Sequence, residues 1–91
     1  MNFEWDEAKA IANLRKHGVT FNEASTVFND PFYVVFADPD HSEDEERFII
    51  VGVSTSGILL VVSFSQRRKN IRLISARLAT RTERKSYEQE I

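Results

Sequence analysis

The chain has 91 residues, a formal net charge of −2 and no cysteine, and 42% of its residues are hydrophobic. This length predicts one domain over residues 1–91, and the composition excludes a disulfide framework, a thiolate metal site and an intrinsically disordered chain. The first ten residues hold three acids and no apolar run, and the aliphatic run of residues 58–62 is about a quarter of a membrane span. We therefore expect a cytoplasmic protein without a membrane partner.

Two short helices are predicted in the first third of the chain. Asp6 is a helix N-cap, apolar residues recur at helical spacing after it, and Gly18 follows as the left-handed residue, which bounds a helix over residues 6–17. Thr20 begins a capping box for a second helix, which ends before Pro31. We expect the two helices to form a compact hairpin.

Four strands are predicted in the middle of the chain. Their β-branched and aromatic residues occupy residues 32–37, 47–54, 58–66 and 71–78. Short turns join the last three strands, which indicates an antiparallel meander. Residues 2–5 are either a further short strand or a lead-in to the first helix.

An acidic loop separates the first two of these strands, because residues 38–46 hold six acids and a proline. His41 with Asp38, Asp40 and Glu43 forms a set of candidate cation ligands. An exposed acidic loop is usually only solvated, so we predict no metal site and no cofactor.

The chain ends in a helix that begins at a second capping box, Thr80 to Glu83. Its apolar content is low, with Tyr87 and Ile91 as the candidates for burial, so we expect it to dock loosely or on a partner. Helices and strands are segregated along the chain, which predicts an α+β fold: an N-terminal helical hairpin packed on an antiparallel meander of about four strands, with a C-terminal helix.

Charge divides the chain into two parts. Residues 1–65 hold 4 bases and 11 acids, a balance of −7, whereas residues 66–91 hold 8 bases and 3 acids, a balance of +5. A basic third attached to an acidic remainder suggests one surface for a polyanion and another for a different partner, although solvated helix and strand faces also carry charge.

The side chains available for chemistry are arginine, lysine, histidine and tyrosine. The sequence has no glycine-rich phosphate loop, no nucleophile elbow and no zinc-binding helix motif. The remaining inventory suits metal-free RNA cleavage, in which the ribose 2′-OH attacks the adjacent phosphate. Arginine offsets the charge that develops on the phosphorane, and histidine, lysine or tyrosine transfers protons.

Each candidate residue also has a structural interpretation. His17 lies where a helix C-terminus favours a cation. Arg72 and Arg77 are separated by an odd number of residues, so an unbulged strand points them to opposite faces of the sheet. Arg81 and Arg84 lie one turn apart on the last helix, as a basic stripe or as a solvated face.

Three separated blocks of the sequence resemble the BrnT family of toxins. The block FEWDEAKAIANLRKHGVTFNEASTVFNDP resembles the family's opening, and DPDHSEDEERFIIVGVS is similar to its acidic loop, its Glu-Arg-Phe and a strand that contains glycine. The block IRLISARLATRTERKSYE resembles the family's end. Order and spacing hold over residues 3–88, which is almost the whole chain.

The resemblance implies a RelE-like ribonuclease fold and the toxin component of a type II toxin–antitoxin module. Members of the family cleave RNA without metal when they are free, which inhibits translation. With a BrnA-like ribbon-helix-helix antitoxin they are neutralised, and they bind operator DNA only through that partner. We therefore expect an endoribonuclease that leaves 2′,3′-cyclic phosphate ends and forms a hetero-oligomer with its antitoxin.

The residues expected to carry this activity fall into two groups. The catalytic group combines proton transfer, phosphate charge and a supporting tyrosine, and consists of Lys16, His17, Arg67, Arg77 and Tyr87. The RNA-binding group consists of Arg72, Arg81 and Arg84.

Gln66 departs from the family pattern. The family has a glutamate before the arginine that Arg67 matches, and glutamine cannot act as a base. The general base is therefore not assigned. This departure slightly favours the alternative function, a non-enzymatic binding module or co-repressor that only holds a DNA-binding partner.

Overall fold

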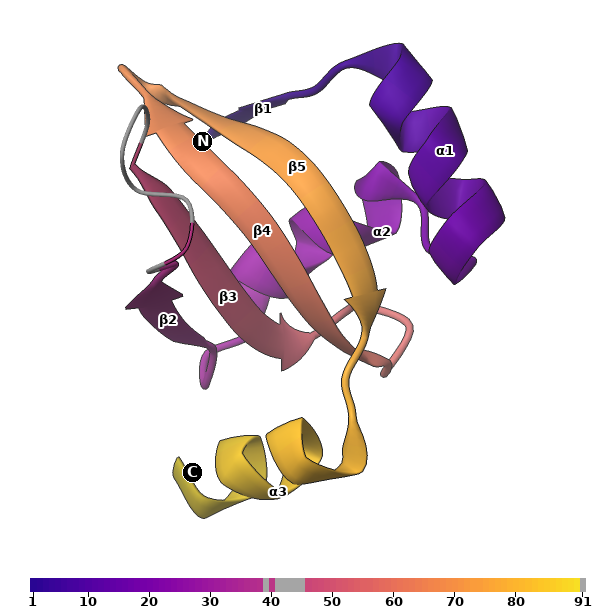
Figure 1. Ribbon diagram of the computed structural model, residues 1–91. Coiled ribbons are helices and arrows are strands. Elements are labelled where there is room, and N and C mark those ends of the chain that lie inside the picture. The colour runs from indigo at the N-terminus through magenta and orange to yellow at the C-terminus, as the bar shows by residue number, and fades with distance from the viewer. Residues whose placement is uncertain (39, 41–45, 91) are drawn as a thin grey trace.

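The computed structural model describes residues 1–38, 40 and 46–90. In this part of the chain a five-stranded sheet carries α1 and α2 on one face and α3 at one end of the other face (Figure 1). The elements are β1 (Asn2–Glu4), α1 (Glu7–His17), α2 (Phe21–Ser25), the 3-10 turn η1 (Thr26–Asn29), β2 (Val34–Ala37), β3 (Arg47–Val53), β4 (Leu59–Arg67), β5 (Asn70–Leu78) and α3 (Arg81–Glu90). No helix in the described residues is long and apolar enough to cross a membrane.

The sheet has the strand order β1-β5-β4-β3-β2. Strands β2 to β5 form the predicted antiparallel meander. The expected number of about four strands is corrected to five, because β1 joins the outer edge and runs parallel to β5. The Phe3 ring packs edge-on against Phe28 with ring centroids 5.1 Å apart, and this burial holds the short strand on the sheet.

The two N-terminal helices begin at the caps that the sequence predicts. The Asp6 carboxylate accepts a hydrogen bond from the Lys9 backbone N–H at 3.1 Å, and Gly18 ends α1 with φ of 70°. The predicted hairpin is wrong in detail, because α1 and α2 both pack on β5 while η1 packs on β3. The helices therefore pack as a layer on the sheet and do not form a separate helical hairpin (Figure 1).

The main core lies between this helical layer and the sheet. The rings of Phe28 and Phe48 pack against Phe64, with centroids 5.1 and 5.6 Å away. Asn13 is buried where α1 packs on β5, and its side-chain amide donates to the Ala76 carbonyl at 2.8 Å and accepts from the Ala76 N–H at 3.0 Å. Through this side chain, α1 satisfies the backbone hydrogen-bonding groups at the edge of β5 at a point that β1 does not reach.

A second, smaller core lies beneath α3. Tyr87 packs against Val51, Leu59 and Val61 on the opposite face of the sheet and is 8% exposed. Its hydroxyl donates to Asp30 at 2.5 Å. The last helix is therefore anchored by a buried contact and a hydrogen bond, where the sequence alone suggests loose docking.

A β-bulge changes which side chains share a face of the sheet. The pairing of β4 with β5 shifts by one residue in the middle of β4, so that Arg72 lies opposite Ser65 and Arg77 lies opposite Val61. Ser65 and Val61 are four residues apart on one strand, so they and both arginines point to the same face. The expectation for an unbulged strand, which places the arginines on opposite faces, is wrong for this reason.

Candidate nucleic-acid interface

The sheet face opposite α1 and α2 is covered at one end by α3, and we call this face the open face. Directly opposed residues of β3, β4 and β5 form rows across it. From α3 toward the β4–β5 turn, the rows are Val51–Val61–Arg77, Ile49–Ser63–Ser75 and Arg47–Ser65–Arg72. The open face therefore passes from apolar residues under α3, through serines, to arginines.

The arginine end of the open face contains three guanidinium groups. Arg72 pairs with Glu4, whose Oε2 lies 3.0 Å from its Nη1, and Glu4 also accepts from the Asn70 side chain at 3.2 Å. Arg67 ends β4 opposite Asn70, and Arg47 begins β3 one strand away. The backbones of Arg47 and Arg72 are two strand spacings apart, about 10 Å, so a single polyanion can contact both side chains.

Arg77 lies at the other end of the open face and binds Glu83. Its two terminal nitrogens donate to the two carboxylate oxygens of Glu83, each at 2.8 Å. The hydrogen bonds from Arg77 lower the pKa of Glu83 to about 2 against the opposing effect of burial. Glu83 also accepts from the Thr80 N–H at 2.8 Å, which confirms the predicted capping box and ties the start of α3 to β5.

Tyr87 lies in the interior beneath α3. Burial, together with the hydrogen bond to the Asp30 carboxylate, raises the pKa of Tyr87 to about 12. Asp30 also accepts from the N–H groups of Val53 at 2.8 Å and Phe32 at 2.9 Å. Burial alone would raise the pKa of Asp30, and these hydrogen bonds hold it below its ordinary value. The Tyr87 hydroxyl is thus committed to holding α3 on the sheet.

Lys16 and His17 lie in the last turn of α1, beside the free edge of β5. They line a hollow of about 230 Å³ with Ile74 and Ser75. Ser75 belongs to the middle row of the open face. The two basic residues therefore lie around the edge of the sheet, next to the serines of the open face.

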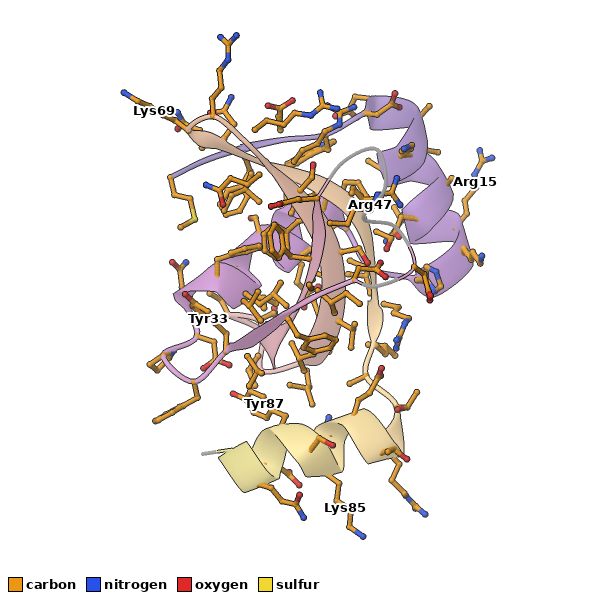
Figure 2. All side chains as sticks on the ribbon, turned by 60° about the vertical axis from the view of Figure 1, so that its left-hand side comes forward. Arg15, Tyr33, Arg47, Lys69, Lys85 and Tyr87 are labelled. Atoms are coloured by element: carbon orange, nitrogen blue, oxygen red, sulfur yellow. The ribbon has the colours of Figure 1, made fainter. Side chains whose placement is uncertain are left out.

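The predicted catalytic group is not gathered at one point, because only Arg67 and Arg77 lie on the open face itself, at its two ends. Arg67 and the residue opposite Arg77, Val61, are six residues apart on β4, which corresponds to roughly 20 Å. Arg81 and Arg84 are exposed on α3. Figure 2 shows Lys69, in the β4–β5 turn, and Lys85, on α3, at opposite ends of the molecule, so the positive charge of the C-terminal third is divided between two surfaces.

Gln66 points away from the open face. It lines a hollow of about 540 Å³ with Phe28, Phe64 and Lys69, on the face that carries the helices. A glutamate at this position would lie on that same face. The presence of glutamine at position 66, where the family has glutamate, therefore does not alter the open face.

Sequence reasoning missed Arg47 and the serines Ser63, Ser65 and Ser75. The signal was present, because Ser63 and Ser65 alternate with the apolar residues Val62 and Phe64 in a strand that otherwise reads as buried on both faces. The candidate cation ligands His41 and Glu43 lie outside the described residues. Among the residues that are described, no group of three or more histidine, aspartate or glutamate side chains forms a metal site.

Comparisons with known proteins agree with this architecture. A sequence profile of the family described as "Ribonuclease toxin, BrnT, of type II toxin-antitoxin system" matches residues 5–83. No curated protein matches the chain. Among solved structures, the fold is similar to the Brucella abortus ribonuclease toxin, BrnT, with a TM-score of 0.70 and 25% identity over 89% of this chain and 99% of that one. The predicted resemblance is confirmed, and the chain belongs to the BrnT family of ribonuclease toxins of type II toxin–antitoxin systems.

Proposed function

We propose that the chain is a metal-independent endoribonuclease that cleaves messenger RNA in the cytoplasm and thereby inhibits translation. The observation that carries this proposal is the open face, where arginines at one end and serines in the middle form a polar strip beside Lys16 and His17. A RelE-like enzyme uses such a sheet face to hold RNA, and family membership supports the ribonuclease class.

In the proposed reaction an RNA strand lies across the open face. Arg67 and Arg72 bind its phosphates, because guanidinium groups form paired hydrogen bonds with phosphate oxygens. Lys16 and His17, at the edge of β5, transfer protons to and from the ribose 2′-OH and the leaving oxygen. Arg77, whose charge Glu83 largely offsets, contacts the RNA at the α3 end of the strip, and Tyr87 supports the site by holding α3 in place.

The rival function is a co-repressor that binds only a DNA-binding partner. Its support from the sequence was Gln66, which cannot replace a catalytic glutamate. Because Gln66 lines a hollow on the helical face, it does not weaken a reaction on the open face. The geometry therefore favours the enzyme over the co-repressor.

We also propose that a ribbon-helix-helix antitoxin neutralises the enzyme by docking beside α3, and that operator DNA is bound only through this partner. An apolar hollow of about 260 Å³ lies between α3 and strands β2 and β3, lined by Val34, Phe36, Val51 and Tyr87 among others. Phe36 is 49% exposed at the edge of the sheet. Arg81 and Arg84 on α3 supply charge for the rim of such a hetero-oligomeric interface.

Incubation of the purified chain with RNA in EDTA tests the enzymatic proposal. We expect cleavage to persist and to leave 2′,3′-cyclic phosphate ends. Replacing Lys16 and His17 together by glutamine is expected to slow cleavage at least tenfold, whereas Arg15→Gln, on the same helix but outside the hollow, leaves the rate unchanged. Cleavage that requires added magnesium refutes the mechanism, and antitoxin binding without any cleavage supports the co-repressor.

Hydrogen exchange with and without the antitoxin tests the docking site. We expect protection in α3 and β2, with stabilisation of about 4 kcal/mol when the free antitoxin is a thousandfold above its dissociation constant. Protection confined to residues 6–30 places the antitoxin on the helical layer and contradicts this docking.

A further inference from the structure

One row of the open face has two features that play no part in the reaction proposed above. The row runs from Arg47 in β3 through Ser65 in β4 to Arg72 in β5. Directly opposed side chains on neighbouring strands have Cβ atoms roughly 5 Å apart, so Ser65 lies between two guanidinium side chains.

The first feature is the charge of Arg47. Arg72 is paired with Glu4 and Arg77 with Glu83, so an acidic side chain offsets the charge of each. Arg47 is half-buried, and no acidic side chain among the described residues pairs with its guanidinium. A guanidinium that no described carboxylate neutralises, on a polar strip, is suited to bind an anion.

The second feature is the hydroxyl of Ser65. This residue is 0% exposed, and its Oγ has no hydrogen-bond partner within the part of the chain that the structure describes. A buried polar group left without a partner costs about 1–3 kcal/mol, so such groups are rare and each calls for an explanation, of which a bound ion is one. Ser65 lies opposite both Arg47 and Arg72, so an anion bound by these arginines would supply the acceptor that its hydroxyl lacks.

We propose that Arg47 and Ser65 form a binding subsite for one phosphate group of the RNA backbone. The guanidinium of Arg47 donates two N–H groups and the Ser65 hydroxyl donates a third hydrogen bond, which matches the several acceptor oxygens of a phosphodiester. Arg72, two strands from Arg47, adds guanidinium N–H groups other than the one that donates to Glu4. This subsite rests on the proposed RNA-cleaving function and identifies part of the surface that binds the substrate.

The subsite binds a phosphate other than the one that is cleaved. Lys16 and His17 lie beside Ser75, which is one row and two strands away from Arg47. One row is about 7 Å and two strand spacings are about 10 Å, so the two positions are roughly 12 Å apart. Arg47 is therefore a positioning residue that holds the strand, and its loss weakens binding more than it slows the chemical step.

The test uses the full chain and one RNA oligonucleotide in two forms. The unmodified RNA is used to measure cleavage. The same RNA, 2′-O-methylated throughout, is used to measure binding, because methylation removes the attacking hydroxyl. For Arg47→Gln we expect a tenfold higher Kd for the methylated RNA and a similar rise in KM, with kcat within twofold of the parent. The slope of log affinity against log salt should fall by about 0.7, the value for one phosphate contact on a single strand. Arg15→Gln, which removes the same charge from α1, is the matched control and should change none of these quantities.

Ser65→Ala supplies the second arm. We expect an affinity about threefold lower and a melting temperature that is not reduced, because the hydroxyl has no partner to lose in the described structure. A lower melting temperature with unchanged affinity gives the hydroxyl a structural role and overturns its place in the subsite.

The outcomes separate this inference from the function on which it rests. If the parent chain cleaves RNA and Arg47→Gln has the same Kd as Arg15→Gln, the subsite is refuted while the ribonuclease proposal stands. A fall in kcat alone for Arg47→Gln also refutes it, because the residue then acts at the reacting phosphate. If the parent chain neither binds nor cleaves RNA, the proposed function fails and the subsite fails with it.

Discussion

The hydrogen bond between Tyr87 and Asp30 gives the sharpest prediction about the fold. Tyr87→Phe removes one hydroxyl and keeps the ring that packs on Val51, Leu59 and Val61. Asp30 then loses one of its hydrogen-bond donors while it stays buried, at 8% exposure. The substitution therefore isolates a polar contact that joins the end of η1 to α3, two segments separated by 57 positions in the sequence.

The expected loss of stability is substantial for a domain of this size. A hydrogen bond to a charged group contributes about 1.5–3 kcal/mol. For a domain of 60–100 residues each kcal/mol shifts the melting temperature by about 4–8 °C, so we expect Tyr87→Phe to melt roughly 6–24 °C below the parent chain.

The pH dependence of this loss follows from the two pKa shifts. The folded pKa of Asp30 lies below its ordinary value of 3.8, so its contribution is complete above that pH and is lost as the pH falls through the folded pKa. The folded pKa of Tyr87 is raised from 10.0 to about 12, so the hydroxyl's contribution is complete below pH 10 and is lost as the pH rises toward 12. The difference between parent and variant should therefore be greatest near neutral pH and shrink at both extremes.

Thermal unfolding followed by circular dichroism at acidic, neutral and alkaline pH measures this difference. Tyr33→Phe is the matched control, because Tyr33 is 48% exposed and lies outside the α3 core. Equal melting temperatures for the two variants at pH 7, or a difference that does not change with pH, would refute the reasoning.

Three further predictions concern the two ends of the open face and the packing behind it. Arg77→Ala and Glu83→Gln both break the ion pair that ties α3 to β5, but only the first removes a group that can act on RNA. The cleavage rate of folded Arg77→Ala should therefore be at least tenfold below that of Glu83→Gln, and equal rates would limit Arg77 to a structural role. Replacing residues 67–69 together by serine should flatten the salt dependence of RNA affinity, and an unchanged slope would show that this turn does not touch the phosphates. Gly52→Ala places a Cβ 2.8 Å from Val27 Cγ1, so urea unfolding should report a loss of about 1–3 kcal/mol, and unchanged stability would show that η1 yields freely.

The parts of the fold that were predicted correctly are those written in local sequence. The caps at Asp6, Thr20 and Thr80 depend on residues three positions away, and each forms the expected hydrogen bond. The four strands of the meander follow from runs of apolar residues and short turns. Such patterns are visible without knowledge of the rest of the chain.

The parts that were missed depend on contacts between distant segments. The parallel pairing of β1 with β5 joins residues 2–4 to residues 70–72, and no local pattern specifies it. Asp30 directly precedes the proline that ends the second predicted helix, and only the structure shows that its carboxylate binds Tyr87 from α3. The bulge in β5 likewise moves Arg72 and Arg77 to one face, which reverses the conclusion drawn from their odd spacing.

In the candidate site, too, local sequence predicts the residue types, whereas contacts between distant segments decide how they are grouped. Arginines were identified as the chemistry-bearing residues from composition alone, but their grouping depends on strand register. Arg47 is isolated in the sequence among acids and apolar residues, and it joins the arginine end of the open face only because β3 pairs with β4.

The central claim is that RNA lies across the open face of the sheet. Titration of the ¹⁵N-labelled chain with 2′-O-methylated RNA, followed by NMR chemical-shift changes, tests it most directly. We predict that the largest shifts fall on Arg47, Ser63, Ser65 and Ser75, with little change at the exposed side of α1. Shifts concentrated on α1 and α2, with the serine and arginine rows unchanged, would contradict the account.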